Sequence, residues 1–137
     1  MRIMALDVGE RRIGVAVSDP LGITAQGVTT YVRAKENLKE DVEGIWKLIK
    51  EYEATELVVG LPKNMNNTLG FKAQEVQDFV AALTKYEEIK VTWVDERLTT
   101  VSAERALLEA DVSRKKRKDV IDKMAAVIIL QSYLDRF

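Results

Sequence analysis

The chain contains no cysteine and no histidine. Without histidine it has no imidazole base and no Ser-His-Asp triad, and without cysteine it has no thiol nucleophile, no disulfide and none of the usual zinc sites. The carboxylates of Asp and Glu are then the side chains left for demanding chemistry, as oxygen ligands of hard cations such as Mg²⁺ or Mn²⁺. The lack of cysteine also fits a cytoplasmic protein, which is the location we expect.

Long hydrophobic runs and a strong net charge are missing as well. No apolar run approaches the ~18–20 residues of a membrane span, and the first residues lead straight into a predicted strand, so we expect neither a signal peptide nor a membrane partner. Only 2 Pro and 7 Gly occur in 137 residues that are 47% apolar, which favours one compact domain over residues 1–137. Because the net charge is −1, any affinity for nucleic acid must come from local basic patches.

Hydrophobic patterning predicts short strands that alternate with helices. Two apolar runs, 2–8 and 12–18, are joined by a tight connection typical of an antiparallel hairpin. Period-two and helical patterns then follow one another to the end of the chain. The further elements expected are a strand at 23–31, a helix at 37–52, a strand at 57–60, a helix at 73–83, a strand at 91–94, a helix from Thr99 or Thr100 to 110, and a last helix at 119–134.

This order predicts an α/β fold with a mixed five-stranded sheet flanked by helices. The first three strands would be antiparallel, and the last two would run parallel to the first because a helix precedes each of them. Ligands of such sheets usually bind at the carboxyl ends of the parallel strands. Asp7 and Glu96 both follow strands that end at that edge.

Asp7 is the first candidate for chemistry. It ends an apolar strand, and a carboxylate held on a rigid element suits a metal ligand or a general base. Glu96 follows Asp95 at the end of a later strand, and successive strand residues point to opposite faces, so the two acids do not easily share a role. Both positions also have structural interpretations, as a turn-starting Asp and as a solvated charged turn. The segments alone leave these alternatives open.

Two further acids lie three residues apart near the end of the chain. On a helix Asp119 and Asp122 share a face, and that face continues from Asp122 to the apolar Ala126 and Ile129. An acid on the border of a buried stripe favours a functional role for Asp122. Asp119 is explained by a helix cap or by a first-turn acid that the helix dipole stabilises.

Two loops are candidates for binding phosphate. The strand-to-helix loop with Asn64, Asn66 and Asn67 could present backbone N–H groups to a substrate, although turn chemistry explains it equally well. Next to Asp119 lies a predicted basic loop whose charge run would attract a nucleic-acid backbone or would simply be solvated. Its five basic residues are Arg114, Lys115, Lys116, Arg117 and Lys118.

Four ordered segments together resemble the YqgF family, also called RuvX, of Holliday-junction-resolvase-like proteins and pre-16S ribosomal RNA nucleases. The resemblance covers nearly the whole chain and implies a ribonuclease-H-like fold. One departure is Asn67, where we expect a glycine, and Asn tolerates the positive φ of such a turn. The segments are Leu6-Asp7-Val8-Gly9 with 12–16 and 18–19, Gly60-Leu61-Pro62 with 64–65, Asp95-Glu96-Arg97-Leu98-Thr99-Thr100, and Asp122-Lys123 with 125–126 and 129–131.

The resemblance implies that Asp7, Glu96 and Asp122 are catalytic acids that hold one or two Mg²⁺ or Mn²⁺ ions for phosphodiester hydrolysis. Arg12 and the five basic residues would bind the nucleic acid, which is a ribosomal RNA precursor or, alternatively, branched DNA. We also consider an actin-like or sugar-kinase-like ATP-binding domain, and a non-catalytic nucleic-acid-binding adaptor. The first needs a second domain and an adenosine site that a chain of this length lacks. A monomer and a homodimer remain open.

Overall fold

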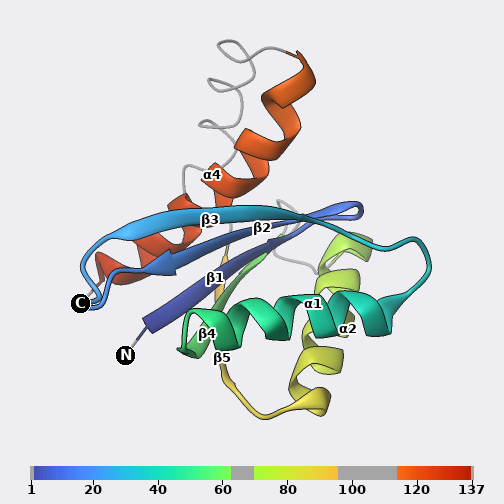
Figure 1. Cartoon of the computed structure of the whole chain (residues 1–137), viewed down its shortest axis with the longest axis horizontal. Coiled ribbons are helices and arrows are strands. Elements are labelled where there is room, and N and C mark those ends of the chain that lie inside the picture. The colour runs from blue at the N-terminus through green and yellow to red at the C-terminus, as the bar shows by residue number, and fades with distance from the viewer. Residues whose placement is uncertain (1, 63–69, 96–113, 137) are drawn as a thin grey trace.

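A computed structural model describes residues 2–62, 70–95 and 114–136, with side chains from residue 120 onward in the last range. Strands and helices alternate after an initial run of three strands (Figure 1). The elements are β1 (Arg2–Val8), β2 (Arg12–Ser18), β3 (Ala25–Val32), α1 (Leu38–Glu51), β4 (Ala54–Leu61), α2 (Phe71–Tyr86), β5 (Lys90–Asp95) and α4 (Arg114–Leu134).

The five strands form one mixed sheet in the order β3-β2-β1-β4-β5. β1 pairs antiparallel with β2, and β2 pairs antiparallel with β3. β4 runs parallel to both β1 and β5. The predicted mixed sheet is therefore confirmed, and the bounds of the first hairpin agree with the prediction because both of its strands are short apolar runs around a tight turn.

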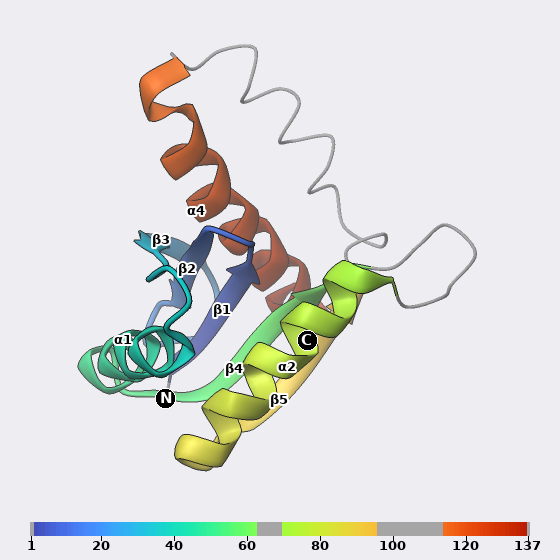
Figure 2. The same cartoon turned by 90° about the vertical axis from the view of Figure 1, so that its right-hand side faces the viewer.

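Helices cover both faces of the sheet. Figure 2 shows α4 on one face and α1 with α2 on the other. Side chains alternate between the two faces along β1: Met4 and Leu6 belong to the core under α1 and α2, whereas Ala5 belongs to the core under α4. Asp7, two residues after Ala5, therefore lies on the α4 face.

Local chemistry fixes the start of α1 and its contact with α2. The side chain of Asn37 caps α1 by accepting a hydrogen bond from the backbone N–H of Glu40 at 3.1 Å. Trp46 then donates its indole N–H to the carbonyl of Leu83 in α2 at 2.9 Å, in the buried layer between the helices. The two helices are thus joined to each other and pack together on one face of the sheet.

The start of α4 differs from the prediction. The helix begins at Arg114, so the basic run that we predicted as a loop forms its first turns. Lys and Arg are good helix formers, but five consecutive charges show no apolar periodicity from which a helix is predicted. Asp119 consequently lies inside the helix, and its interpretation as a cap or first-turn acid is wrong.

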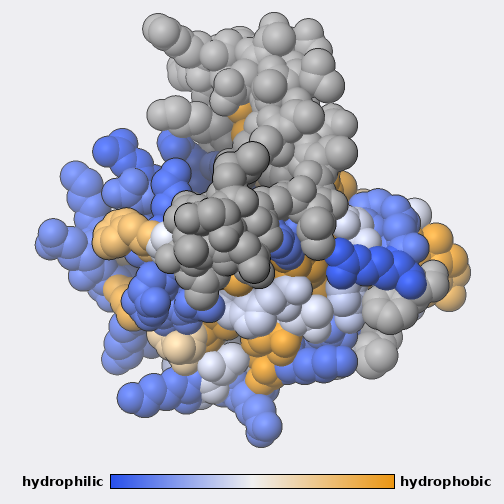
Figure 3. Space-filling model, turned by 180° about the vertical axis from the view of Figure 1, so that it is seen from behind, coloured by the Kyte–Doolittle hydropathy of each residue, from blue (hydrophilic) through white to orange (hydrophobic). Residues whose placement is uncertain are grey.

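Hydrophobic side chains also reach the surface. On the face seen in Figure 3, hydrophobic areas are interrupted by hydrophilic ones. The large hydrophobic residues that are exposed lie on several different elements, namely Leu21, Ile23, Val32, Leu38, Phe71, Tyr86 and Trp93. Among the described residues, no helix combines the length and the hydrophobicity needed to cross a membrane.

Candidate functional site

Asp7 lies near the carboxyl end of β1 and is only 5% exposed. The turn that follows is closed by a hydrogen bond of 2.8 Å from the Gly9 N–H to the carbonyl of Arg12. Because β1 is paired on both sides within the sheet, the strand holds this carboxylate rigidly. A buried carboxylate is tolerated when it is hydrogen-bonded, paired with a charge or bound to a cation.

The backbone of Asp122 lies against Gly14, which is the cross-strand neighbour of Asp7. In the antiparallel register Asp7 faces Gly14 on β2, so the two residues share the α4 face. A Cβ atom built on Gly14 would collide with the carbonyl group of Asp122 and would lie 3.2 Å from the N atom of Lys123. The backbone of α4 therefore rests directly on β2 at this point, and Asp7 and Asp122 are brought together.

Contacts further along α4 hold the helix in this position. The stem of Lys123 lies against Gly27 of β3. The side-chain oxygen of Gln131 accepts the Ala25 N–H at 3.0 Å, and its amide nitrogen donates to the carbonyl of Ile23 at 3.2 Å. These contacts attach α4 to β3 and to the connection before it, which limits movement of Asp122 relative to the sheet.

A polar cluster fixes the far end of the helix. The hydroxyl groups of Tyr133 and Thr92 each donate to the Glu56 carboxylate at 2.8 Å. Burial, together with the hydrogen bond to Glu56, raises the pKa of Tyr133 above its usual value, so the hydroxyl stays protonated as a donor. The cluster has a structural role in joining α4 to β4 and β5.

The third predicted acid, Glu96, lies outside the described residues. β5 ends just before it at Asp95, and Asp95 is on the opposite face from Val94, which packs under α4. Within the part of the chain that the structure describes, no group of three or more Asp or Glu residues is close enough to hold a metal ion. Of the three predicted acids, the described residues include Asp7 and Asp122.

Those predicted nucleic-acid contact residues that the structure describes lie at the same edge of the sheet as Asp7. Arg12 is half-buried at the start of β2, where strand alternation places it on the same face as Gly14, and it also lines a cavity beside the β1–β2 turn. Figure 2 shows the first turns of α4 extending beyond the ends of β1 and β2, and these turns carry residues 114–118. Arg114 precedes Asp122 by ~12 Å along the helix at 1.5 Å per residue. Asn64, Asn66 and Asn67 lie outside the described residues.

Two polar residues in the segments that resemble the family prove to be structural. The Ser18 hydroxyl accepts the Ile3 N–H at 2.9 Å. The Asp19 carboxylate accepts the N–H groups of Ile23 and Thr24 at 2.7 and 3.0 Å, and these bonds lower its pKa. Ser18 therefore joins the end of β2 to β1, and Asp19 shapes the connection between β2 and β3. An Asp ahead of a Pro-Leu-Gly turn is the signal for this role.

Sequence reasoning missed a buried ion pair on the opposite face. Asp41 in the first turn of α1 is 1% exposed and accepts hydrogen bonds from Arg33 Nε at 3.0 Å and from the Ala34 N–H at 2.8 Å. The pair joins the end of β3 to α1. The one signal was an acid in the first turn, which usually needs no partner beyond the helix dipole.

Two curated proteins are similar in sequence over nearly the whole chain. A protein of Natranaerobius thermophilus named "Putative pre-16S rRNA nuclease" is 57% identical over 136 residues, which cover 99% of this chain and 95% of the relative. A protein of the same name from Halalkalibacterium halodurans is 55% identical, with 99% and 97% covered.

Among solved structures, RuvC of T. thermophilus in complex with a Holliday junction substrate is similar with a TM-score of 0.60 and 13% identity over 99% of this chain and 95% of that one. The Holliday junction resolvase of fowlpox virus has a TM-score of 0.59 and 14% identity, with both chains fully covered. These similarities show a shared fold. The sequence itself matches the RuvX family, described as Holliday junction resolvase, over residues 1–136, and the chain therefore belongs to this family.

Proposed function

We propose that this protein is a divalent-metal-dependent nuclease that hydrolyses phosphodiester bonds in the precursor of 16S ribosomal RNA. The observation that carries the proposal is the contact of α4 with β2 at Gly14, the cross-strand partner of Asp7, which brings the backbone of Asp122 next to the carboxyl end of β1. The names of two relatives that are 57% and 55% identical support the substrate.

The side chains at this edge fit a hard cation. Asp7 supplies a carboxylate that is nearly buried on a rigid strand, and Asp122 brings a second acid from the helix. Oxygen donors of this kind suit Mg²⁺ or Mn²⁺, and the sequence offers no nitrogen or sulfur ligand from His or Cys. Glu96, the acid one residue after β5, would complete the set in this proposal.

Each group has a part in the proposed reaction. Asp7, Glu96 and Asp122 would hold the metal, which when bound lowers the pKa of a coordinated water and stabilises charge on the leaving oxygen. Asp7 would set the position of the site, because its strand is the most rigidly held of the three elements. The basic first turns of α4 and Arg12 would hold the phosphates on either side of the scissile bond.

A panel of substrates tests the proposal. Purified protein is incubated with a 5′-extended precursor fragment of 16S RNA, a mature 16S fragment of equal length, an RNA duplex and a four-way DNA junction, each with Mn²⁺ and with EDTA. We expect metal-dependent cleavage of the precursor fragment within its extension. Absence of cleavage of every substrate with Mn²⁺ present would contradict the proposal.

Resolution of Holliday junctions is the second candidate function, favoured by the description of the matched family. A junction resolvase cuts two symmetric strands and so acts as a dimer. Preferential, paired cleavage of the four-way junction by a dimeric protein, with the RNA precursor left intact, would favour this alternative. The same acids would serve both reactions, so only the substrate separates them.

A further inference from the structure

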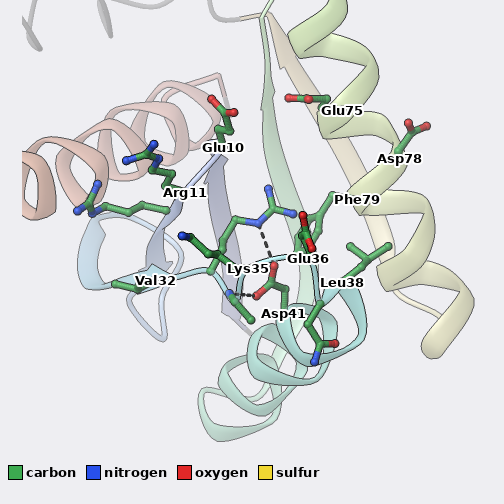
Figure 4. Close-up of a pocket in the computed structure, with 14 residues that line it drawn as sticks. Glu10, Arg11, Val32, Lys35, Glu36, Leu38, Asp41, Glu75, Asp78 and Phe79 are labelled. Atoms are coloured by element: carbon green, nitrogen blue, oxygen red, sulfur yellow. Dashed lines mark hydrogen bonds and ion pairs between the residues drawn. The ribbon is translucent and has the colours of Figure 1, made fainter.

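A cavity of about 850 Å³ lies on the sheet face opposite to the acids, beside the turn between β1 and β2. The connection between β3 and α1 forms its floor, and the first half of α2 forms one wall (Figure 4). Among its lining residues are exposed apolar side chains, Val32 and Leu38, and charges of both signs. Most of its lining residues lie on the β3–α1 connection, α1 and α2, and Arg12 also contributes to the lining.

Arg33 forms a fixed planar surface in the wall of the cavity. Its Nε donates to Asp41 at 3.0 Å and its Nη1 donates to the Gly9 carbonyl at 2.9 Å, so two bonds set the orientation of the guanidinium plane. One side of the plane lies over the ring of Phe79, with 5.0 Å between Cζ and the ring centre. The side chain is still 20% exposed, and it lines the cavity. A preoriented guanidinium plane is a stacking surface for a nucleobase.

Charges of both signs line the cavity. Arg11 lies in the β1–β2 turn next to Glu10, and Lys35 lies in the connection between β3 and α1. Figure 4 shows Glu75 extending from α2 toward the cavity from the other side. Asp78 lines the same wall, but its carboxylate already accepts a hydrogen bond from Gln74 at 2.9 Å. Basic side chains bind phosphate, whereas a carboxylate accepts hydrogen bonds from amino groups on base edges.

We propose that this cavity binds one unpaired base of a single-stranded nucleic acid, with the base stacked on Arg33, its amino group bonded to Glu75 and its phosphate held by Arg11 and Lys35. A purely anionic ligand would be repelled by the α2 wall, and a base inside a duplex could not enter. The inference rests on the proposed nuclease function and specifies its substrate as one with a single-stranded segment.

The position of the cavity links it to the acids. The Gly9 carbonyl that fixes Arg33 belongs to the turn directly after β1, and Asp7 lies two residues earlier. Two residues span at most ~7 Å of chain. A nucleic-acid strand that crosses the β1–β2 turn would therefore pass from the face of Asp7 to the cavity within one or two nucleotides.

Binding measurements test the proposal. Fluorescence anisotropy in EDTA would compare 12-nucleotide single strands of oligo-C and oligo-U with an RNA duplex of the same length. Cytosine carries an amino group and uracil does not, so the wild-type protein should bind oligo-C at least about threefold more tightly than oligo-U. Glu75→Ala should bring this ratio close to one, and the matched control Asp78→Ala, which removes the same charge from the same wall, should keep it.

Two further variants test the stacking surface and the phosphate contact. Arg33→Lys should weaken binding of both single strands by about fivefold or more and leave duplex binding unchanged, as expected for loss of a stacked base. Arg11→Ala should weaken single-strand binding more than Lys47→Ala, which removes a charge from the exposed side of α1 outside the cavity. If Arg33→Lys does not fold, the comparison of Glu75→Ala with Asp78→Ala still decides whether the cavity binds a base.

Equal base ratios in the two α2 variants, or a wild-type protein without base preference, would overturn the proposal. Equal effects of Arg11→Ala and Lys47→Ala would overturn it as well and would assign the cavity to another ligand, such as a peptide. The variant Asp7→Asn separates this inference from the proposed function, because it should lose cleavage and keep the base preference.

Discussion

Asp7 is the residue whose environment most needs a function. A carboxylate that is 5% exposed at the end of a paired strand brings a desolvation cost. A second acid from α4 nearby adds repulsion between like charges when both are ionised. A bound divalent cation would remove both penalties at once.

We therefore expect Mn²⁺ or Mg²⁺ to raise the melting temperature. A ligand bound only by the folded state adds ~2.7 kcal/mol of stability at a concentration of a hundred times Kd. Asp7→Asn should abolish most of this increase. Asp95→Asn, at the same edge but on the opposite face of the sheet, is the matched control and should retain it. Differential scanning fluorimetry across a metal titration makes the comparison, and an equal increase in both variants would mean that the ion binds elsewhere.

The two acids of α4 should differ in importance. Asp122 is the one whose backbone rests on Gly14 beside Asp7, whereas Asp119 lies ~4.5 Å further along the helix axis. Asp122→Ala should therefore reduce the cleavage rate more than Asp119→Ala. Because Asp119 lies inside the helix, we expect no loss of a helix cap in its variant. Initial cleavage rates of the two variants are compared at equal folded fractions. Equal decreases in rate would add Asp119 to the site.

At the scale of elements, the contact between β2 and α4 is the feature on which the site depends. Gly14→Ala would place a methyl group against the backbone of Asp122, which cannot turn away as a side chain can. Overpacking of this kind costs ~1–3 kcal/mol, and the shift of α4 should also reduce cleavage. In Gly27→Ala the new methyl group meets only the flexible stem of Lys123, so the destabilisation should be smaller. Urea denaturation measures the loss in free energy of unfolding of both variants. Equal losses would contradict the importance of the contact between Gly14 and α4.

The basic first turns of α4 lead to a second prediction at this scale. Replacing the five basic residues 114–118 with Gln should weaken nucleic-acid binding, while Gln retains the helix propensity. For every phosphate that is no longer neutralised, the slope of log K against log salt should become shallower by about 0.9 on a duplex or 0.7 on a single strand. Binding measured over a salt series tests this. A variant with the wild-type slope would show that the substrate docks on another surface.

These elements also show what the sequence could predict. The β1–β2 hairpin and the parallel strands were predictable because alternation and short turns are local signals. The helical form of 114–118 was not, because a run of charges has no apolar stripe. The contact of Gly14 with Asp122 and the ion pair of Arg33 with Asp41 depend on how separate elements pack, so neither has a local signal.

At the scale of the whole molecule, the carboxyl edge of the sheet joins two surfaces. The acids and the basic turns of α4 lie on one face, and the cavity beside the β1–β2 turn lies on the other. Because the net charge is −1, the proposed binding of nucleic acid would depend on local groups such as these rather than on a general positive field. Under the two proposals, a nucleic-acid strand would pass over this edge from one surface to the other.

The role of Asp7 in a metal-dependent nuclease site is tested most simply by rates of Mn²⁺-dependent cleavage of a 16S precursor fragment. The rates are compared for the wild-type protein, for Asp7→Asn and for the control Asp95→Asn. We expect cleavage by the wild-type protein and by Asp95→Asn, and a decrease of at least about a hundredfold in Asp7→Asn while its circular dichroism spectrum remains that of the folded protein. Cleavage by a folded Asp7→Asn at the wild-type rate would contradict this role of Asp7.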